Sequence, residues 1–229
     1  GAALTAQLKD RLLEQIPNMM LMDGLGASET GSQARALSTH DAEATTGTFE
    51  PGPGMAVLSA DLSAPVQPGH DELGWLAQEG RVPLGYLNDP AKSAQTFVQL
   101  DGRRYAIPGD RARLRADGTM ELHGRDSATI NSGGEKIFAE EVEQAIMPHP
   151  AVYDVVVCGR PSERWGNEVV AVVQLYEDAA ASAEELLAEA ARHVARYKLP
   201  KQIVYSDHIQ RSPAGKADYR WARGMVTNG

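Results

Sequence analysis

Residues 124–143 read GRDSATINSGGEKIFAEEVE, and the pattern of the chain changes at this stretch. Gly124 and Arg125 end a region of short apolar segments. Gly133-Gly134 predicts a tight bend, because glycine adopts positive φ without strain. A plain loop before a charged helix accounts for the acids that follow, which suit the positive end of a helix dipole. It does not account for the whole string. The acids are Glu140, Glu141 and Glu143.

Upstream, residues 55–123 hold short apolar segments separated by Gly, Pro and Asp, which predict strands of a sheet or small barrel. Asp117-Gly118 is a hairpin-turn signal between two of them. The segments are MAVLSADL, GWLAQEG, VPLGYL, RYAIPGD, RARLR and MELHGR.

Downstream, helices alternate with strands. Residues 139–147 are expected to be helical, VYDVVVCG and EVVAVVQLY are valine-rich strand candidates, and KQIVYS is a further strand. Ser182 and Glu185 form an S-x-x-E capping box, before a helix that carries Leu186, Ala190 and Val194 on one face.

The change of pattern near 124–127 predicts a domain boundary, with a strand-rich part at 1–126 and a mixed part at 127–229. The mixture of helices and strands predicts an α/β (α+β) fold.

At the start of the chain, residues 4–16 predict an amphipathic helix with Thr5 as N-cap and Leu8, Leu12 and Ile16 on one face. Residues 19–22 suggest a buried strand that ends in a glycine-rich loop, DGLGASETG. Because the helix begins without an initiating Met or a lead-in, we interpret Gly1 as an internal position of a longer protein.

The composition excludes several classes of protein. A net charge of −9 gives no general attraction to nucleic acid, and no apolar run is long enough for a transmembrane helix. One cysteine, Cys158, cannot form an internal disulfide, and the six histidines show no zinc-ligand spacing. These features favour a reducing, cytoplasmic compartment.

Three short segments could carry chemistry beside residues 124–143. The loop Gly24–Gly31 combines glycines, a hydroxyl and Glu29, which suits a phosphate with its Mg²⁺, although a plain turn at a strand end explains it too. It lacks the G-x-G-x-x-G of a dinucleotide site. Asp110 ends YAIPGD, where a carboxylate can accept two hydrogen bonds from a ribose diol or simply form a turn. Lys216 follows a small-residue loop and is either a charge for a phosphate or a solvated lysine.

In this order, the four segments resemble the adenylate-forming superfamily, which includes acyl-CoA synthetases, firefly luciferase and the adenylation domains of peptide synthetases. LGASE at 25–29 is similar to Y-G-x-T-E, with Leu25 in place of the aromatic residue, and YAIPGD is similar to Y-x-T-G-D. Residues 124–143 match G-R-x-x-D-x-I-x-x-G-G-x-x-I-x-x-x-E-I-E over most of their length. PAGK resembles P-x-x-G-K, RYKLP resembles Y-K-x-P, and Gly85-Tyr86 with NDPAKSAQTF resembles another family segment.

The resemblance implies the strand-rich end of a large AMP-binding domain, followed by a small α+β lid. It also implies an acyl-CoA ligase that activates a fatty or related carboxylic acid with ATP and Mg²⁺ and transfers it to CoA. Lys216 then balances the charge of the first step, Ser28 contacts phosphate, Glu29 binds Mg²⁺, and Asp110 with Arg125 holds the ribose. The other residues implied in binding nucleotide or CoA are Gly1, Ala2, Gly24, Leu25, Gly26, Ala27, Gly133 and Gly134.

The resemblance places the hinge of the lid near Ser127 and makes the chain the C-terminal part of a synthetase, inactive alone. Its partners are then the missing N-terminal part of the same protein and the substrates, with a homodimer as a further expectation. Two alternatives stay open. The acceptor is a carrier protein rather than CoA, or the chain is a non-catalytic interaction fragment.

Overall fold

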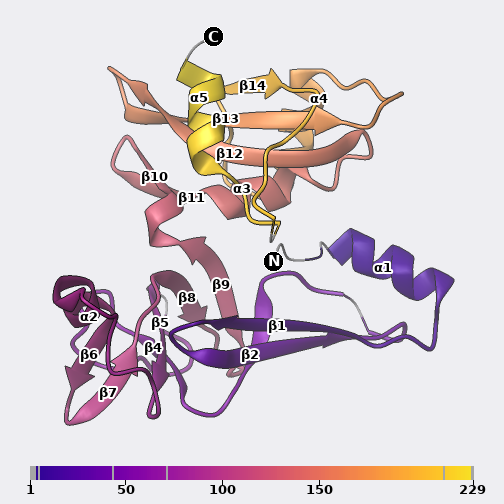
Figure 1. Cartoon of the computed structure of the whole chain (residues 1–229). Coiled ribbons are helices and arrows are strands. Elements are labelled where there is room, and N and C mark those ends of the chain that lie inside the picture. Colours follow the sequence, from indigo (N-terminus) through magenta and orange to yellow (C-terminus); the bar gives the residue numbers. More distant parts are fainter. Residues whose placement is uncertain (1–3, 5, 43, 71, 214, 228–229) are drawn as a thin grey trace. The chain divides into compact units, whose positions relative to one another are not determined.

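The computed structural model describes residues 4, 6–42, 44–70, 72–213 and 215–227. They form two compact units (Figure 1), here called the N-terminal unit, up to Asp126, and the C-terminal unit, from Ser127 onward. A short 3₁₀ turn, η1 (Asp126–Ala128), lies at the junction. Each unit has its own sheet and its own apolar core.

The N-terminal unit is a largely antiparallel sheet with two helices. Its strands follow the order β1-β2-β3-β9-β8-β5-β7-β6, and β4 pairs with β5. The elements are α1 (Ala6–Gln15), β1 (Leu21–Ala27), β2 (Gly31–Ser38), β3 (Thr48–Pro51), β4 (Met55–Leu58), β5 (Gly74–Glu79), α2 (Pro90–Thr96), β6 (Phe97–Leu100), β7 (Arg103–Ala106), β8 (Asp110–Leu114) and β9 (Met120–Arg125).

Strand β5 is covered on both of its faces by apolar side chains. Leu76 packs in one apolar cluster with Phe49, Val57 and Met120, and its neighbour Ala77 packs in a second cluster with Tyr105. Successive side chains of a strand point to opposite faces, so a strand covered on both faces reads as an apolar run. The first four residues of β5, GWLA, follow this pattern.

The inward face of α1 differs from the sequence prediction. Leu13 and Lys9 are buried, whereas Leu8 and Ile16 are exposed. Lys9 tolerates burial because its ammonium group forms an ion pair with Asp23 and donates to the carbonyl oxygen of Thr45. The predicted cap, Thr5, lies outside the described residues.

Two strand predictions are also corrected. Met20 and Met22 are exposed, so residues 19–22 are not a buried strand, and the sheet instead begins at Leu21. VPLGYL forms no named strand. The other five quoted segments each contain a strand, and Asp117-Gly118 lies in the turn between β8 and β9, as predicted.

The C-terminal unit is a sheet of order β11-β10-β13-β12, with β14 parallel to β13. Its elements are β10 (Thr129–Ser132), β11 (Glu135–Phe138), α3 (Ala139–Ile146), β12 (Val152–Ser162), β13 (Gly166–Leu175), α4 (Ala183–Ala190), the 3₁₀ turn η2 (Arg196–Lys198), β14 (Gln202–Tyr205) and α5 (Tyr219–Thr227). The expected helix after Gly134, the two valine strands and the Ser182–Glu185 capping box are all present.

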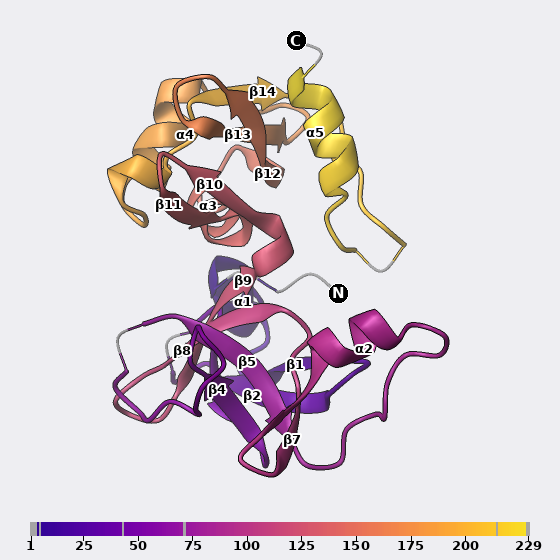
Figure 2. The same ribbon diagram turned by 90° about the vertical axis from the view of Figure 1, so that its left-hand side faces the viewer.

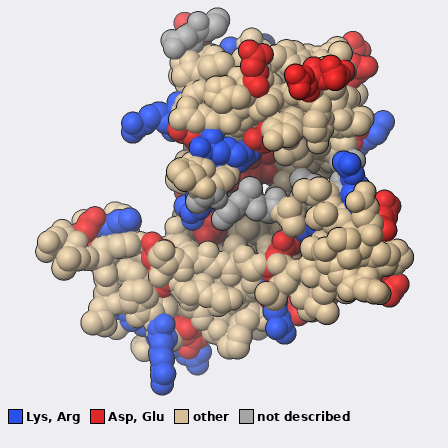
Figure 3. Space-filling model, turned by 45° about the vertical axis from the view of Figure 1, so that its right-hand side comes forward, with Lys and Arg blue, Asp and Glu red and all other residues tan. Residues whose placement is uncertain are grey.

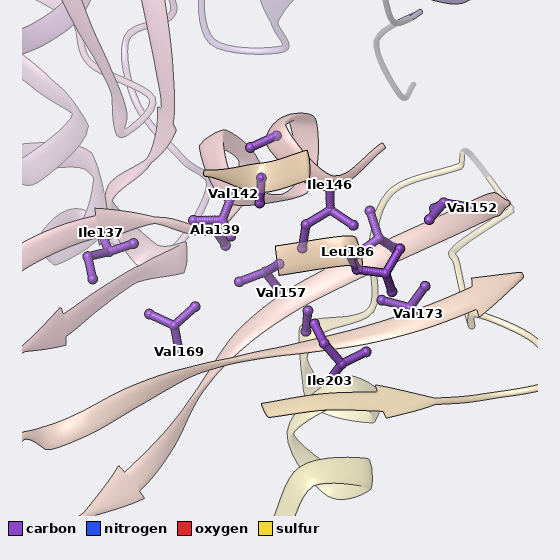
Figure 4. Packing of buried hydrophobic residues seen from close by; sticks show 14 of the residues in the cluster. Ile137, Ala139, Val142, Ile146, Val152, Val157, Val169, Val173, Leu186 and Ile203 are labelled. Atoms are coloured by element: carbon purple, nitrogen blue, oxygen red, sulfur yellow. The ribbon is translucent and has the colours of Figure 1, made fainter. Parts of the chain in front are cut away.

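The valines of β12 and β13 alternate between two cores. Val155 and Val157 pack with Val142 of α3 and Leu186 of α4 in the cluster of Figure 4, whereas Val156 packs with residues of α5 on the other face. Figure 2 shows α3 and α4 on one side of this sheet and α5 on the other. Burial on both faces explains the continuous apolar sequence of both strands.

Gly133 and Gly134 form the tight turn between β10 and β11, with φ of +59° and +91°. The amide of Gly133 donates to the carbonyl oxygen of Trp165 at 2.9 Å. A Cβ atom on Gly133 would lie 2.8 Å from the Trp165 ring, whereas one on Gly134 would meet no atom within 4 Å. The hairpin turn therefore lies directly against the indole.

On the face shown in Figure 3, basic and acidic side chains are interspersed. No helix in the described part of the chain is long and apolar enough to span a bilayer.

The hairpin contact gives a test of the fold. We expect Gly133→Ala to lower the free energy of unfolding of the C-terminal unit by about 1–3 kcal/mol, through positive-φ strain and the clash with Trp165. In a Trp165→Ala background the clash is removed, so the loss caused by Gly133→Ala should shrink. Gly134→Ala, which meets no ring, should cost the same in both backgrounds. Chemical denaturation of the four variants and their parents measures this, and equal costs for Gly133→Ala in both backgrounds would contradict it.

Candidate functional site

The glycine-rich segment at 24–31 is mostly strand rather than the predicted loop. β1 runs through Gly24, Leu25 and Gly26 to Ala27, paired with β2. A Cβ atom on Gly26 would lie 2.2 Å from the carbonyl oxygen of Gly31, so this glycine permits the close approach of the two strands. Leu25 packs, partly buried, against the core of the unit. The segment therefore contributes a strand edge, and only its end forms a turn.

That turn holds Ser28 and Glu29. Thr30 closes it, because its amide donates to the carbonyl oxygen of Ala27 at 3.1 Å and its Oγ1 accepts the amide of Ala27 at 3.0 Å. Ser28 and Glu29 are thus consecutive residues of the closed turn at the tip of the β1–β2 hairpin.

Tyr86 orients the carboxylate of Glu29, a contact that the sequence did not reveal. The tyrosine hydroxyl donates to Oε1 of Glu29 at 2.6 Å. The ring lies 5.6 Å from that of Phe97, and the ammonium group of Lys92 lies 4.1 Å from its centroid. Ser93 of α2 accepts the Tyr86 amide at 2.7 Å. The sequence feature that could have pointed to Tyr86 is the segment Gly85-Tyr86 with NDPAKSAQTF. It is part of the family resemblance, but no role was predicted for it.

These contacts keep Glu29 ionised. The Tyr86 hydrogen bond lowers the pKa of Glu29 most, and the charges of Lys92 and Arg125 lower it further, against an opposing effect of burial. An ionised carboxylate is a hard oxygen ligand of the kind that Mg²⁺ prefers.

Asp110 and Arg125 face each other across β8 and β9. The Nε atom of Arg125 lies 3.4 Å from Oδ1 of Asp110, whose carboxylate is largely buried, while about half of the arginine side chain is exposed. The amide of Asp126 donates to the carbonyl oxygen of Gly109, which has φ of +102°. The start of β8 and the end of β9 are thereby held together, with the Asp110 carboxylate paired to the Arg125 guanidinium.

The N-terminal unit therefore brings together predicted residues that are far apart in sequence. Arg125 pairs with Asp110 and its charge also acts on Glu29, next to Ser28. Among the described residues no group of three or more His, Cys, Asp or Glu side chains is arranged to hold a metal ion. Mg²⁺ is commonly bound by one or two carboxylates together with substrate phosphates, and Glu29 fits that chemistry. The predicted adenine contacts, Gly1 and Ala2, lie outside the described residues.

Lys216 belongs to the C-terminal unit. Its side chain is exposed and forms no ion pair with any described residue. Its backbone is held on both sides, because the amide of Ser212 donates to the carbonyl oxygen of Lys216 at 2.8 Å and the Lys216 amide donates to Oγ of Ser212 at 3.1 Å. Gly215 completes the turn with φ of +78°. The turn thus presents an ammonium group that has no ion-pair partner among the described residues, on a backbone that is hydrogen-bonded to Ser212.

A partly buried acid in this unit was missed in the sequence analysis. Glu143 lies in the inward stripe of α3 beside Val142 and Ile146, and its Oε1 accepts the amide of Val157 at 2.9 Å. Burial raises the pKa of Glu143 to about 8. The helical spacing of residues 139, 142, 143 and 146 was the signal, since it puts this glutamate among apolar positions.

A small pocket of about 130 Å³ opens beside Ser127 and is lined in part by Cys158, Asn167, Tyr219 and Arg223. Burial raises the pKa of the Cys158 thiol to about 11, so it stays protonated at neutral pH. A protonated, buried thiol is a poor nucleophile.

Comparison with known proteins agrees with the fold class and with the resemblance to acyl-CoA ligases. Residues 141–216 match the family model of the AMP-binding enzyme C-terminal domain. A medium-chain acyl-CoA ligase of Mycobacterium avium is 62% identical over 229 residues, 100% of this chain and 42% of the ligase. A 3-oxocholest-4-en-26-oate–CoA ligase of Rhodococcus rhodochrous is 43% identical over 227 residues, 99% of this chain and 41% of that enzyme. The chain thus spans less than half the length of these relatives.

A solved structure of ATP-bound MatB from Rhodopseudomonas palustris superimposes with a TM-score of 0.82 at 23% identity, covering 100% of this chain and 44% of that one. At this identity the likeness concerns the fold alone. It confirms the predicted mixture of helices and strands.

The Glu29–Tyr86 contact can be tested directly. In Tyr86→Phe we expect the pKa of Glu29 to rise toward its ordinary value of 4.5, because the largest stabiliser of the carboxylate is lost. Carboxyl ¹³C NMR titration measures this. Tyr205→Phe, a change in the C-terminal unit, is the control and should leave the titration of Glu29 unaltered. An unchanged Glu29 pKa in Tyr86→Phe would show that the neighbouring cations hold the carboxylate instead.

Glu143 gives a prediction of pH dependence. Its folded-state pKa of about 8 lies above its ordinary value of 4.5, so the unfolded state releases its proton first as the pH rises. Stability should therefore be lost between about pH 4.5 and pH 8, at up to about 1.4 kcal/mol per pH unit.

We expect Glu143→Gln, which keeps an acceptor for Val157, to lack that loss, so its stability relative to wild type increases with pH. Denaturation at pH 5 and pH 8 measures the difference. Glu177→Gln, at an exposed position, serves as the control. Parallel pH profiles for wild type and Glu143→Gln would refute the assignment.

Proposed function

We propose that this chain, which belongs to the adenylate-forming superfamily, works as part of an ATP-dependent, AMP-forming acyl-CoA ligase. The observation that carries the proposal is the 62% identity to a medium-chain acyl-CoA ligase over all 229 residues, a range that includes every motif segment. Medium-chain fatty acids are therefore the proposed substrates, and steroid side-chain acids, by likeness to the second relative, are the next class.

In the first step the carboxylate of the substrate attacks the α-phosphate of ATP, forming acyl-adenylate and releasing pyrophosphate. We assign Asp110 and Arg125 to the ribose hydroxyls, because a paired carboxylate and guanidinium offer both acceptor and donor atoms. Ser28 contacts phosphate, and the strand edge from Gly24 to Ala27 borders the nucleotide. Gly1 and Ala2 stay assigned to adenine from the sequence alone.

Glu29 is assigned to Mg²⁺, which supplies neutralisation of phosphate charge when bound. The support is that Tyr86, Lys92 and Arg125 keep this carboxylate ionised. Tyr86 acts as a positioning residue that fixes which carboxylate oxygen remains available.

Lys216 is assigned to the negative charge that develops as the substrate oxygen attacks the α-phosphate. A preorganised cation at such a position stabilises the transition state more than the ground state. The support is that Lys216 is exposed, has no ion-pair partner in the described part of the chain, and has its backbone hydrogen-bonded to Ser212.

In the second step the CoA thiol attacks the acyl carbon and AMP leaves. Gly133 and Gly134 are assigned to the pantetheine channel, where the hairpin turn offers backbone without side chains. We place the hinge between the steps at Ser127, since the two compact units meet there in sequence.

The test is an assay of the full-length protein with ATP, Mg²⁺ and CoA across medium-chain, long-chain, aromatic and steroid carboxylic acids. We expect acyl-CoA and AMP in equal amounts, with medium-chain acids as the fastest substrates. Omission of Mg²⁺ should abolish turnover. Adenylate formation without transfer to CoA, but with transfer to an acyl carrier protein, would favour the carrier-loading alternative.

The charge of Lys216 has a specific kinetic signature. In the full-length protein, Lys216→Ala should lower adenylate formation by about 10²–10³-fold, because its ammonium group acts on the first transition state. Thioester formation from supplied acyl-adenylate should be largely kept. Lys201→Ala, another exposed lysine of the same unit, is the matched control and should leave both half-reactions unchanged. Equal losses in the two half-reactions of Lys216→Ala would refute the assignment.

A further inference from the structure

The turn that carries Lys216 closes on itself between Arg211 and Ala217. These two residues form an antiparallel bridge, and Ser212 binds the backbone of Lys216 through both its amide and its hydroxyl. The ends of the turn are held by apolar packing, since Ile209 is buried and Ala217 packs against the same cluster. These contacts hold the two ends of the turn together. They do not include a polar contact from the turn to the sheet.

Arg211 supplies that contact through one guanidinium group. Its Nε and Nη2 atoms donate to the two carboxylate oxygens of Asp154 on β12, at 2.7 and 2.6 Å. Its Nη1 atom donates to the carbonyl oxygen of Gly215 at 3.2 Å, on the peptide unit directly before Lys216. One planar group therefore joins the sheet to the backbone that leads into Lys216.

Only arginine can make this set of contacts to Asp154 and Gly215. The pair is bidentate and shielded, with 26% of the Arg211 side chain and 15% of the Asp154 side chain exposed. Such fork-to-carboxylate pairs are stronger and more directional than single charge contacts. A lysine would keep the charge but could not bind both carboxylate oxygens and the Gly215 carbonyl in one plane.

Asp154 is itself held in place. Its Oδ1 atom accepts the amide of Val155 at 2.8 Å, within β12, which pairs with β13 over most of its length. Further along β12, the amide of Val157 donates to the carboxylate of Glu143 on α3. The anchor of the turn is therefore a rigid strand rather than another loop.

We propose that Arg211, held by Asp154, is a positioning residue that sets the location of the Lys216 ammonium group for adenylate formation. The inference rests on the proposed function of Lys216. In this scheme Arg211 acts through the backbone of the turn, because its guanidinium group donates to both carboxylate oxygens of Asp154 and to the carbonyl oxygen of Gly215. A misplacement of about 1 Å in a catalytic group is enough to cost up to about 10²-fold in rate.

The experiment uses the full-length protein with Arg211→Ala, Arg211→Lys and Asp154→Asn, and with Arg192→Ala as the control. Arg192 is an exposed arginine whose ion-pair partner, among the residues that the structure describes, is Glu189 of α4. Adenylate formation and thioester formation are measured separately, and thermal melting identifies any variant that fails to fold. We expect Arg211→Ala and Asp154→Asn to lose about 10–100-fold in adenylate formation and to keep thioester formation. Arg211→Lys should recover part of the loss.

A double-mutant cycle separates positioning from a general structural role. Combined with Lys216→Ala, Arg211→Ala should cause little further loss, because the group that it positions is gone. Additive losses, or equal losses in both half-reactions, would overturn the proposal.

Hydrogen exchange gives a readout that does not need activity. The amides of Gly215 and Lys216, which donate to Ser212, should exchange faster in Arg211→Ala than in wild type or Arg192→Ala. Exchange at the wild-type rate would overturn the positioning role whatever the activity. Absence of adenylate formation by the wild-type protein would instead overturn the proposed function, so the two failures are distinguishable.

Discussion

The pairing of β12 with β13, from Val152 opposite Leu175 to Ser162 opposite Gly166, is the constraint on which the C-terminal unit depends. Alternate side chains of these strands enter two separate cores, so the sheet requires helices on both faces. Strand β12 also holds polar side chains of two other segments. Asp154 binds Arg211 and the amide of Val157 binds Glu143, which ties a loop and a helix to one rigid element.

In the N-terminal unit, the hydrogen bond from Tyr86 to Glu29 has a comparable effect on a smaller scale. It joins the tip of the β1–β2 hairpin to the segment before α2, across 57 positions of sequence. The cation of Lys92 above the Tyr86 ring and the Asp110–Arg125 pair add charge around the same carboxylate. Ion pairs and hydrogen bonds from separate strands thus define one electrostatic environment, in which the acid stays deprotonated.

The two units place their charges by different means. Glu29 is surrounded by donors and cations that fix its ionisation, whereas Lys216 forms no ion pair among the described residues and owes its place to the backbone beneath it. This difference suits the roles proposed for them. A metal ligand must be charged and oriented before its ion arrives, and a transition-state cation is most effective when no protein anion already neutralises it.

The sequence by itself determined the elements whose causes are local. The capping box at Ser182, the tight turn at Gly133-Gly134 and the valine strands follow from short-range chemistry, and all are present. The motif segments led to the prediction of Ser28, Glu29, Asp110, Arg125 and Lys216 as site residues, because each segment resembles a pattern of neighbouring residues in a known family.

Only the tertiary structure decided which groups meet. The inward face of α1 is set by the Lys9–Asp23 ion pair and by Leu13, contacts that helical periodicity does not contain. The glycines at 24–26 are strand residues because β2 pairs with them, although glycine alone favours a loop. Tyr86 reaches Glu29, and Arg211 reaches Asp154, over separations that local propensity does not encode. The physical reason is that these contacts depend on sheet register and side-chain packing, which exist only once the chain has folded.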